Sequence, residues 1–152
     1  GASVGDHDLV HEVLTREGMA LDFWKIAMRP GKPLMFGRLG STRCVGLPGN
    51  PVASLVCTEL FLKPLAARLG GFSYESPIAE ATLGAAMAAN DLRQDYVRAR
   101  LEHTAAGLVA TPHAVQDSSM LRTIADSGAL IVREPFAPPL PAGSRVKVLR
   151  LR

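Results

Sequence analysis

The chain has 152 residues, a length that accommodates one ordinary domain or two small ones. Hydrophobic residues make up 47% and charged residues 20%, which is typical of a globular protein and excludes a disordered chain. The longest apolar run, Val52 to Leu62, is too short for a transmembrane helix. The net charge of +3 suits an anionic small molecule, whereas 5% aromatic residues and no basic stripe argue against nucleic-acid binding.

The amino-terminal segment has neither the basic nor the apolar region of a secretory signal, and we expect the chain to be a piece of a longer protein. Cys44 and Cys57 have apolar neighbours and no CxxC spacing, so buried, reduced thiols are expected. Together these features predict a cytoplasmic protein.

Apolar spacing predicts an amphipathic helix that begins after Asp6, runs to Glu17 and is ended by Gly18. His7 and His11 stand one turn apart on this helix and could bind a metal ion. No third ligand follows at a zinc-like spacing, so the preferred interpretation is an exposed helix face.

A strand is predicted over Leu21 to Met28, and its alternation would place Lys25 and Arg29 on the same side. Two short strands should follow, at 34–37 and 43–47. A long apolar helix is then predicted over 51–69, and Pro64 should kink or divide it.

This order of elements predicts an α/β fold: residues 1–73 form the second half of an α/β sandwich domain, with ligand sites at strand ends. Glycines and polar residues at 70–77 form the best linker candidate. Beyond it, residues 76–152 predict a small all-β domain, a sheet or a barrel. Its expected elements are a short helix at 119–126 and strands at 78–83, 95–103, 108–111, 129–133 and 145–151.

GLPGNP, at 46–51, is the most informative motif. Asn50 is a good helix N-cap, and Pro51 suits the first helical position. Gly46 and Gly49 permit tight backbone paths. Free N–H groups in the first turn of the helix would form an anion site, the alternative being a capped turn with a purely structural role.

Three cations lie just upstream of this motif, within eight residues: Lys25, Arg29 and Lys32, around a second turn at Pro30-Gly31. Cations combined with tight turns favour a phosphate-type ligand. The alternative is that all three are solvated surface side chains.

Three segments together resemble the molybdopterin molybdenumtransferase family, which includes bacterial MoeA and the E domain of gephyrin. They are SVGDHDLV at 3–10, FWKIAMRPGKPLMFG at 23–37 and GLPGNPVASLV at 46–56. Two further segments are similar to the C-terminal β domain of that family, at 93–101 and 116–134. The resemblance implies that 1–73 is the C-terminal half of the molybdopterin-binding domain and 76–152 the C-terminal domain.

The activity implied by this resemblance is transfer of molybdenum from molybdate to adenylylated molybdopterin, with release of AMP and a requirement for magnesium. The family also implies a homodimer. The chain by itself is expected to have little or no catalysis, because other walls of the site would lie in segments it does not contain.

Matching positions of the family motifs imply the roles of individual residues. Asp8 and Lys25 are the expected catalytic residues, and Asp8 is also the expected magnesium ligand; its alternative role is a carboxylate that favours a helix N-terminus. Ten residues are expected to bind the substrate: Ser3, Gly5, Arg29, Lys32, Pro48, Gly49, Asn50, Pro51, Arg98 and Ser118. Arg29 replaces the lysine common in the family, and ordinary structural roles remain open for Arg98, on an exposed strand face, and Ser118, as a helix cap.

Two other functions stay open. A molybdopterin adenylyltransferase would share the α/β domain, but the β domain after Ser73 argues against it. A non-enzymatic scaffolding module, as in the gephyrin relatives, is the third possibility, although no segment suggests a receptor partner.

Overall fold

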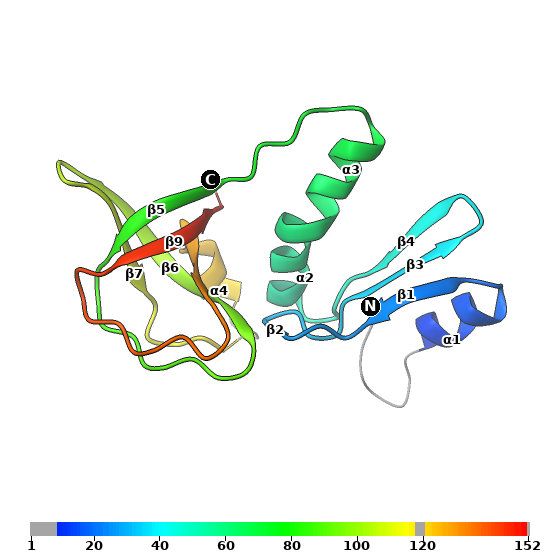
Figure 1. Cartoon of the computed structure of the whole chain (residues 1–152), viewed down its shortest axis with the longest axis horizontal. Helices are drawn as coiled ribbons and strands as arrows, with labels where there is room; N and C mark the ends of the chain where they lie inside the picture. The colour runs from blue at the N-terminus through cyan, green and yellow to red at the C-terminus, as the bar shows by residue number, and fades with distance from the viewer. Residues whose placement is uncertain (1–8, 118–120, 152) are drawn as a thin grey trace. The chain divides into compact units, whose positions relative to one another are not determined.

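A computed structural model describes residues 9–117 and 121–151 of the chain (Figure 1). The chain divides into two compact units, Gly1–Ser73 and Tyr74–Arg152. The fold is mixed α/β in the first unit and all-β apart from one short helix in the second. None of the helices in the described ranges is both long enough and apolar enough to cross a membrane.

The first unit is built on a three-stranded antiparallel sheet in the order β1-β3-β4. Its strands are β1 (Ala20–Trp24), β3 (Met35–Leu39) and β4 (Thr42–Gly46). Gly40, with φ of 56°, makes the tight turn between β3 and β4.

Helix α1 (Leu9–Arg16) precedes the sheet and ends where the sequence predicts. Gly18 has φ of 92°, its N–H donates to the Thr15 carbonyl, and the Met19 N–H donates to the Leu14 carbonyl. This pair of bonds is a Schellman motif, which stops the helix at glycine. The expected cap, Asp6, lies outside the described residues.

The predicted helix over 51–69 is present in three parts: α2 (Pro51–Cys57), the π-helical segment η1 (Thr58–Leu62) and α3 (Lys63–Leu69). Proline has no N–H to donate, and its ring crowds the carbonyl four residues earlier. The wider π turn just before Pro64, in which the Lys63 N–H donates to the Thr58 carbonyl, accommodates that ring. The expectation that Pro64 kinks or divides the helix is met by this π-helical interruption, through which the helix continues.

The strand predicted over Leu21 to Met28 is wrong in its second half. Strand β1 ends at Trp24, Lys25 has φ of 74°, and a separate two-residue strand, β2 (Met28–Arg29), follows. Strand alternation therefore does not apply between Lys25 and Arg29, and the expectation that it places them on one side is not supported.

The second unit is a closed five-stranded barrel. Its strands are β5 (Ile78–Leu83), β6 (Gln94–Thr104), β7 (Gly107–Pro112), β8 (Ala129–Arg133) and β9 (Arg145–Arg150). Pairing runs β6-β7-β5-β9-β8 and returns to β6, with β5 and β7 parallel and all other pairs antiparallel. Closure removes exposed strand edges, so the barrel form of the prediction is confirmed.

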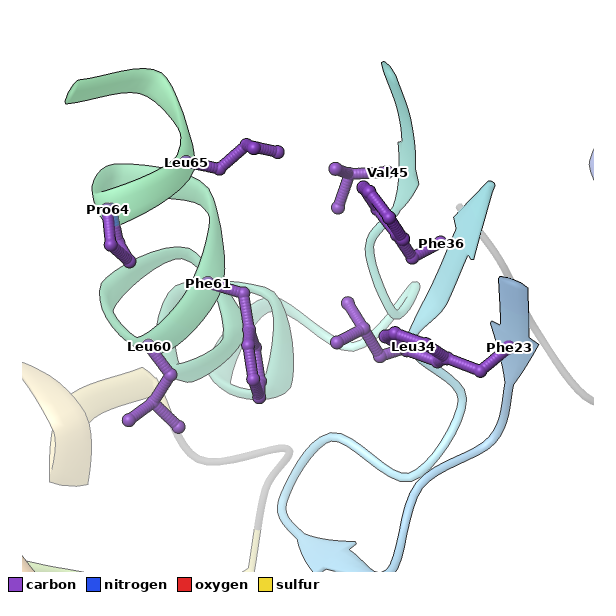
Figure 2. A pocket seen from close by; sticks show the side chains of 8 residues that line it. All are labelled: Phe23, Leu34, Phe36, Val45, Leu60, Phe61, Pro64 and Leu65. Carbon is purple, nitrogen blue, oxygen red and sulfur yellow. The ribbon is translucent and has the colours of Figure 1, made fainter. Parts of the chain in front are cut away.

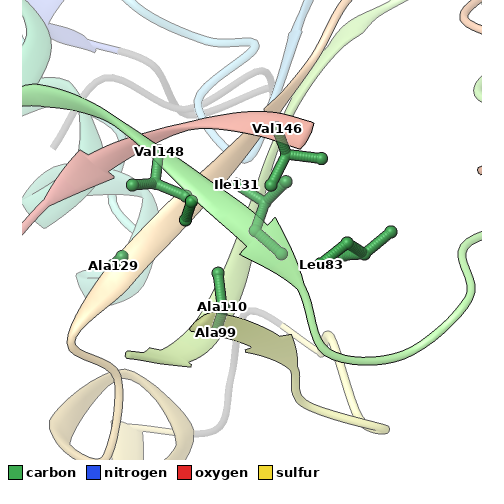
Figure 3. Close-up of a cluster of buried hydrophobic side chains, with 8 residues drawn as sticks. Leu83, Ala99, Ala110, Ala129, Ile131, Val146 and Val148 are labelled. Atoms are coloured by element: carbon green, nitrogen blue, oxygen red, sulfur yellow. The ribbon is translucent and has the colours of Figure 1, made fainter. Parts of the chain in front are cut away.

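Small and branched side chains fill the barrel (Figure 3). Alanines alternate with larger aliphatic residues on the inward positions, which lets strands approach closely without voids. The buried set is Ala81, Leu83, Ala99, Ala110, Ala129, Ile131, Val146 and Val148. Helix α4 (Leu121–Ala125) lies between β7 and β8 in the chain.

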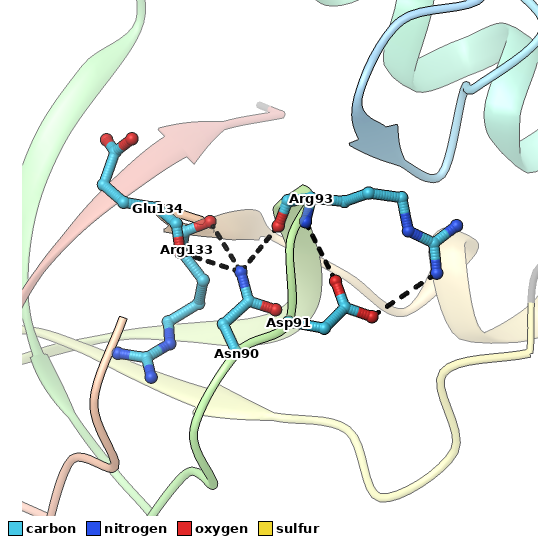
Figure 4. A network of polar contacts seen from close by, with 5 residues as sticks. All are labelled: Asn90, Asp91, Arg93, Arg133 and Glu134. Atoms are coloured by element: carbon cyan, nitrogen blue, oxygen red, sulfur yellow. Dashed lines mark hydrogen bonds and ion pairs between the residues drawn. The ribbon is translucent and has the colours of Figure 1, made fainter. Parts of the chain in front are cut away.

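Polar side chains hold the long loops of the second unit (Figure 4). The Asn90 side-chain amide donates to the carbonyls of Arg93 (2.7 Å), Glu134 (2.8 Å) and Arg133 (3.2 Å). The buried Arg133 guanidinium donates to the carbonyls of Ala88 (3.1 Å) and of Pro138 (2.6 Å) in the proline-rich loop. These bonds supply donors to carbonyls of the loops and of the last residue of β8.

Candidate functional site

The segment 25–34 forms a closed loop, which we call the cation loop because it carries Lys25, Arg29 and Lys32. The Lys25 N–H donates to the Leu34 carbonyl (3.0 Å), and the Ile26 N–H donates to the Lys32 carbonyl (2.9 Å). These two bonds place the backbones of Lys25 and Lys32 on facing arms at the base of the loop. The side chains of the three cations are exposed to solvent.

Buried apolar contacts fix the cation loop against helix α2. Met28 and Leu34 are buried, and the Cys57 thiol of α2 lies 4.0 Å from the Gly31 carbonyl. Burial raises the pKa of the Cys57 thiol to about 11, so it stays protonated and unreactive near neutral pH, as the apolar neighbours predict.

The cation loop and the GLPGNP turn leave the same end of the β3–β4 hairpin. Met35, the first residue of β3, pairs with Gly46, the last residue of β4. The residues before Met35 and those after Gly46 therefore emerge together. The structure thus brings the two sequence motifs to one end of the hairpin, which makes them a candidate site for a shared ligand.

Within the turn, Asn50 caps helix α2 as predicted. Its side-chain oxygen accepts from the N–H groups of Val52 and Ala53, both at 3.1 Å, and the Ser54 hydroxyl donates to the Pro48 carbonyl. The expectation of free first-turn N–H groups is wrong, because Pro51 has none and Asn50 uses the next two. Any anion held here must use side-chain cations or other parts of the turn.

The Trp24 ring is contacted by two side chains, those of Lys25 and His11. The Lys25 ammonium lies 4.4 Å from the centroid of the indole ring, and the His11 ring stacks on the indole with centroids 4.5 Å apart and planes at 16°. His11 is therefore packed on an aromatic ring rather than displayed on an open helix face. Sequence reasoning missed both partners, although a lone tryptophan directly before a predicted functional lysine was the available signal.

Arg98 is buried, with 2% of its surface exposed, so the structural alternative of an exposed strand face is wrong. Its guanidinium donates to the Asp117 carbonyl (2.8 Å) and to the Gln116 side-chain oxygen (3.3 Å). Gln116 also exchanges hydrogen bonds with the Arg98 backbone. Burial lowers the pKa of the Arg98 guanidinium, and the charge of Asp117 opposes that shift. Arg98 thus holds the 113–117 segment on β6, and a binding role remains a prediction.

Ser3, Gly5, His7, Asp8 and Ser118 lie outside the described residues, so their predicted roles stay predictions. Within 9–117 and 121–151, no group of three or more His, Cys, Asp or Glu side chains could hold a metal ion. The expected magnesium ligand, Asp8, lies outside these ranges, so the magnesium site stays a prediction.

An apolar cavity of about 230 Å³ lies between the helix and the sheet of the first unit (Figure 2). Its walls are Phe23, Leu34, Phe36, Val45, Leu60, Phe61, Pro64 and Leu65. A lining without charged or hydrogen-bonding side chains does not suit a pterin nucleotide or an oxyanion. The cation loop and the adjacent turn are therefore the better candidate site.

Two family models match the chain in succession. Residues 1–68 match the model described as "Probable molybdopterin binding domain", and residues 80–151 match "MoeA C-terminal region (domain IV)". The matched ranges fall in the first and second unit respectively.

Curated relatives give the same result. The whole chain aligns with the molybdopterin molybdenumtransferase of Bacillus subtilis at 33% identity. Of the chain, 47% aligns with the molybdopterin molybdenumtransferase of Haemophilus influenzae, at 48% identity. These alignments cover 36% and 17% of the two relatives. The chain thus spans about a third of the Bacillus protein.

Solved structures support the fold. The molybdopterin biosynthesis MoeA protein of Pyrococcus horikoshii matches with a TM-score of 0.79 and 24% identity, over 95% of this chain and 35% of that one. A molybdenum cofactor biosynthesis protein of Pyrococcus furiosus matches with a TM-score of 0.73 and 22% identity, over 94% and 54%. The chain belongs to the molybdopterin molybdenumtransferase family, of which it carries the two matched regions.

Proposed function

We propose that the chain supplies one wall of the pterin-nucleotide site of an enzyme of molybdenum cofactor biosynthesis. The reaction is transfer of molybdenum from molybdate to adenylylated molybdopterin, with release of AMP. The observation that carries the proposal is the placement of the cation loop beside the GLPGNP turn at one end of the β3–β4 hairpin.

The chemistry needs positive charge more than it needs a nucleophile from the protein. Release of AMP breaks a phosphoanhydride bond, and negative charge accumulates on the departing phosphate oxygens. A fixed ammonium or guanidinium close to those oxygens lowers the barrier by electrostatic stabilisation. Lys25 and Lys32, on facing arms of a hydrogen-bonded loop, are suited to this role, and Arg29 of the same loop retains the charge of the family's lysine.

The turn residues supply shape rather than charge. Pro48 is buried and Asn50 is tied to the start of α2, so the backbone around Gly49 is held rigid. Nothing lies within 4 Å of a β-carbon added at Gly49, which leaves room on that side for close approach of a ligand.

Several parts of the proposal rest on the family alone. They are Asp8 as a catalytic residue and magnesium ligand, Ser3, Gly5 and Ser118 as binding residues, and homodimeric assembly. The proposed cytoplasmic location rests instead on the two free cysteines. If Asp8 holds magnesium, the ion would supply charge neutralisation on phosphate oxygens. The barrel of the second unit favours this function over a molybdopterin adenylyltransferase.

The test compares Lys25→Ala with Arg43→Ala in the full-length protein that carries this sequence. Arg43 is also an exposed cation of the first unit, but it lies at the Gly40 end of the hairpin, away from the turn. We expect Lys25→Ala to slow molybdate-dependent AMP release by about 100-fold, because a positioned charge is lost from the transition state. Arg43→Ala should retain the wild-type rate.

Unchanged turnover in Lys25→Ala would remove this residue from the site. Equal losses in the two variants would point to net charge rather than to a positioned cation. Circular dichroism and thermal unfolding of both variants separate these outcomes from misfolding. The 152-residue chain alone is expected to release little AMP. Substantial turnover by it would contradict the proposal that it supplies only one wall of the site.

A further inference from the structure

Trp24 makes a contact that strand geometry normally forbids. In an extended strand, neighbouring side chains project from opposite faces, so Trp24 and Lys25 should point apart. The Lys25 ammonium instead lies over the Trp24 ring, 4.4 Å from its centroid. The backbone provides the explanation, because Lys25 has φ of 74° and breaks the alternation.

Two backbone hydrogen bonds across the cation loop hold Lys25 in this left-handed conformation. The N–H groups of Lys25 and Ile26 donate to the carbonyls of Leu34 and Lys32, at 3.0 and 2.9 Å. A residue with a β-carbon costs about 1–2 kcal/mol in this region, so it is retained only where the surroundings enforce it. Strain at a residue with an exposed charge points to a functional requirement for the placement of that charge.

Stacking, rather than a hydrogen bond, holds the indole ring of Trp24 in place. His11 stacks on the ring at 4.5 Å, whereas the indole N–H is buried and makes no hydrogen bond within the described parts of the chain. Ring stacking of this kind fixes the plane of the indole. The ring therefore forms a rigid platform for the ammonium group.

An aromatic face holds a cation without neutralising it. No ion pair joins Lys25 to any of the described residues, and the nearby Asp22 carboxylate is paired with Arg38 at 3.0 Å. A carboxylate partner would cancel the charge that an anionic ligand needs, whereas the quadrupole of an indole ring attracts the ammonium and leaves its charge in place.

We infer that Trp24 is a positioning residue, which holds the Lys25 ammonium for the phosphate of the substrate and is itself fixed by His11. The inference rests on the proposed function, in which Lys25 contacts that phosphate. It predicts that loss of the ring acts on the reaction only through Lys25.

The first experiment is a double-mutant cycle in the full-length protein, with AMP release from adenylylated molybdopterin as the readout. Trp24→Leu should lower kcat/KM by about two- to fivefold, the range given by an exposed cation–π contact. Trp24→Phe keeps a ring and should restore most of that loss. In the Lys25→Ala background, Trp24→Leu should have no further effect.

The second experiment detects the contact itself, without any substrate. In a proton NMR spectrum of the same protein, the Lys25 methylene protons next to the ammonium nitrogen should show an upfield ring-current shift. The signal is assigned by its disappearance in Lys25→Ala. The shift should vanish in Trp24→Leu and persist in Trp24→Phe. Phe23→Leu is the matched control, because this neighbouring ring pairs with Phe36 instead, and it should leave the shift unchanged.

The outcomes distinguish failure of the positioning role of Trp24 from failure of the proposed role of Lys25. If Lys25→Ala impairs turnover but Trp24→Leu acts equally in both backgrounds, Trp24 has a merely structural role and the positioning inference is overturned. Absence of the ring-current shift overturns it as well. If Lys25→Ala leaves turnover unchanged, the proposed function fails at this residue, and the inference fails with it even where the shift is present.

Discussion

Gly31 of the cation loop occupies a position at which any other residue would be strained. Its φ is 121°, and a β-carbon there would lie 2.7 Å from the Cys57 sulfur and 3.0 Å from the terminal methyl of Met28. Both neighbours are buried, and the Cys57 sulfur, on a short side chain of α2, is the firmer obstacle of the two. The glycine is thus required for conformation and for packing against α2.

Gly31→Ala should lower the free energy of unfolding by about 2–4 kcal/mol, the sum of left-handed strain and overpacking. Gly40→Ala is the matched control: Gly40 also has a positive φ, 56°, but nothing lies within 4 Å of its added β-carbon. It should cost only about 1 kcal/mol. Urea unfolding measures both, and equal losses would show that packing against Cys57 contributes nothing.

Arg98 shows where residue-level prediction failed. An arginine on a strand is most often exposed, yet this one is buried and bonded to Gln116 and to the Asp117 carbonyl. The partners lie 18 and 19 positions away in the sequence. Strand periodicity contains no information on such a distant acceptor, so burial could not be inferred from it.

At the scale of elements, the helix after GLPGNP was the best-predicted part of the chain. Asn50, Pro51 and Pro64 act through local backbone chemistry, and each has the effect that its residue type predicts. The same local chemistry explains why the first turn of α2 offers no free N–H groups to an anion. The capping side chain and the anion would compete for the same N–H groups.

Asn50→Ala should lower the free energy of unfolding by about 1 kcal/mol, because the N–H groups of Val52 and Ala53 lose their acceptor. Asn50→Asp keeps an acceptor of the same geometry and should retain the wild-type stability. Chemical denaturation of the two variants and the wild type provides the measurement. An Asn50→Ala protein as stable as wild type would mean that water replaces the cap without cost.

Strand β1 marks the limit of element-level prediction. The residues after Trp24 continue an apolar pattern that suits a strand, but the chain turns left-handed at Lys25 and closes the cation loop. The N–H groups of Lys25 and Ile26 donate to the carbonyls of residues 34 and 32. The end of strand β1 therefore depends on hydrogen bonds across the loop. Periodicity within a single strand cannot detect it.

At the scale of the whole molecule, the chain is two compact units joined by an exposed segment. Residues 70–76 are all exposed, and the Phe72 side chain retains 74% of its surface in solvent. A connection of this kind is the preferred site for proteases, because cleavage requires an accessible and deformable backbone.

Limited chymotrypsin digestion of the 152-residue chain should therefore cut first at Phe72 or Tyr74. The expected products are two fragments that divide near residue 73 and resist further cleavage, read by intact mass spectrometry. The aromatic residues within the sheet and the barrel provide the internal control, since they should be cut much later. Early cleavage inside 78–112 would contradict the stability expected of a closed barrel.

The sequence by itself determined the family, the α/β and all-β composition of the two halves, the helix limits at Gly18 and Asn50, and the break at Pro64. These depend on interactions between residues close in the chain, or on motifs that survive as runs of letters. Only the tertiary structure decided the closure of the barrel, the burial of Arg98, the contact of Lys25 with Trp24, and the stacking of His11 on that indole ring. Each of these depends on which surfaces meet when the chain folds, and the energy of such a contact belongs to the pair rather than to either residue.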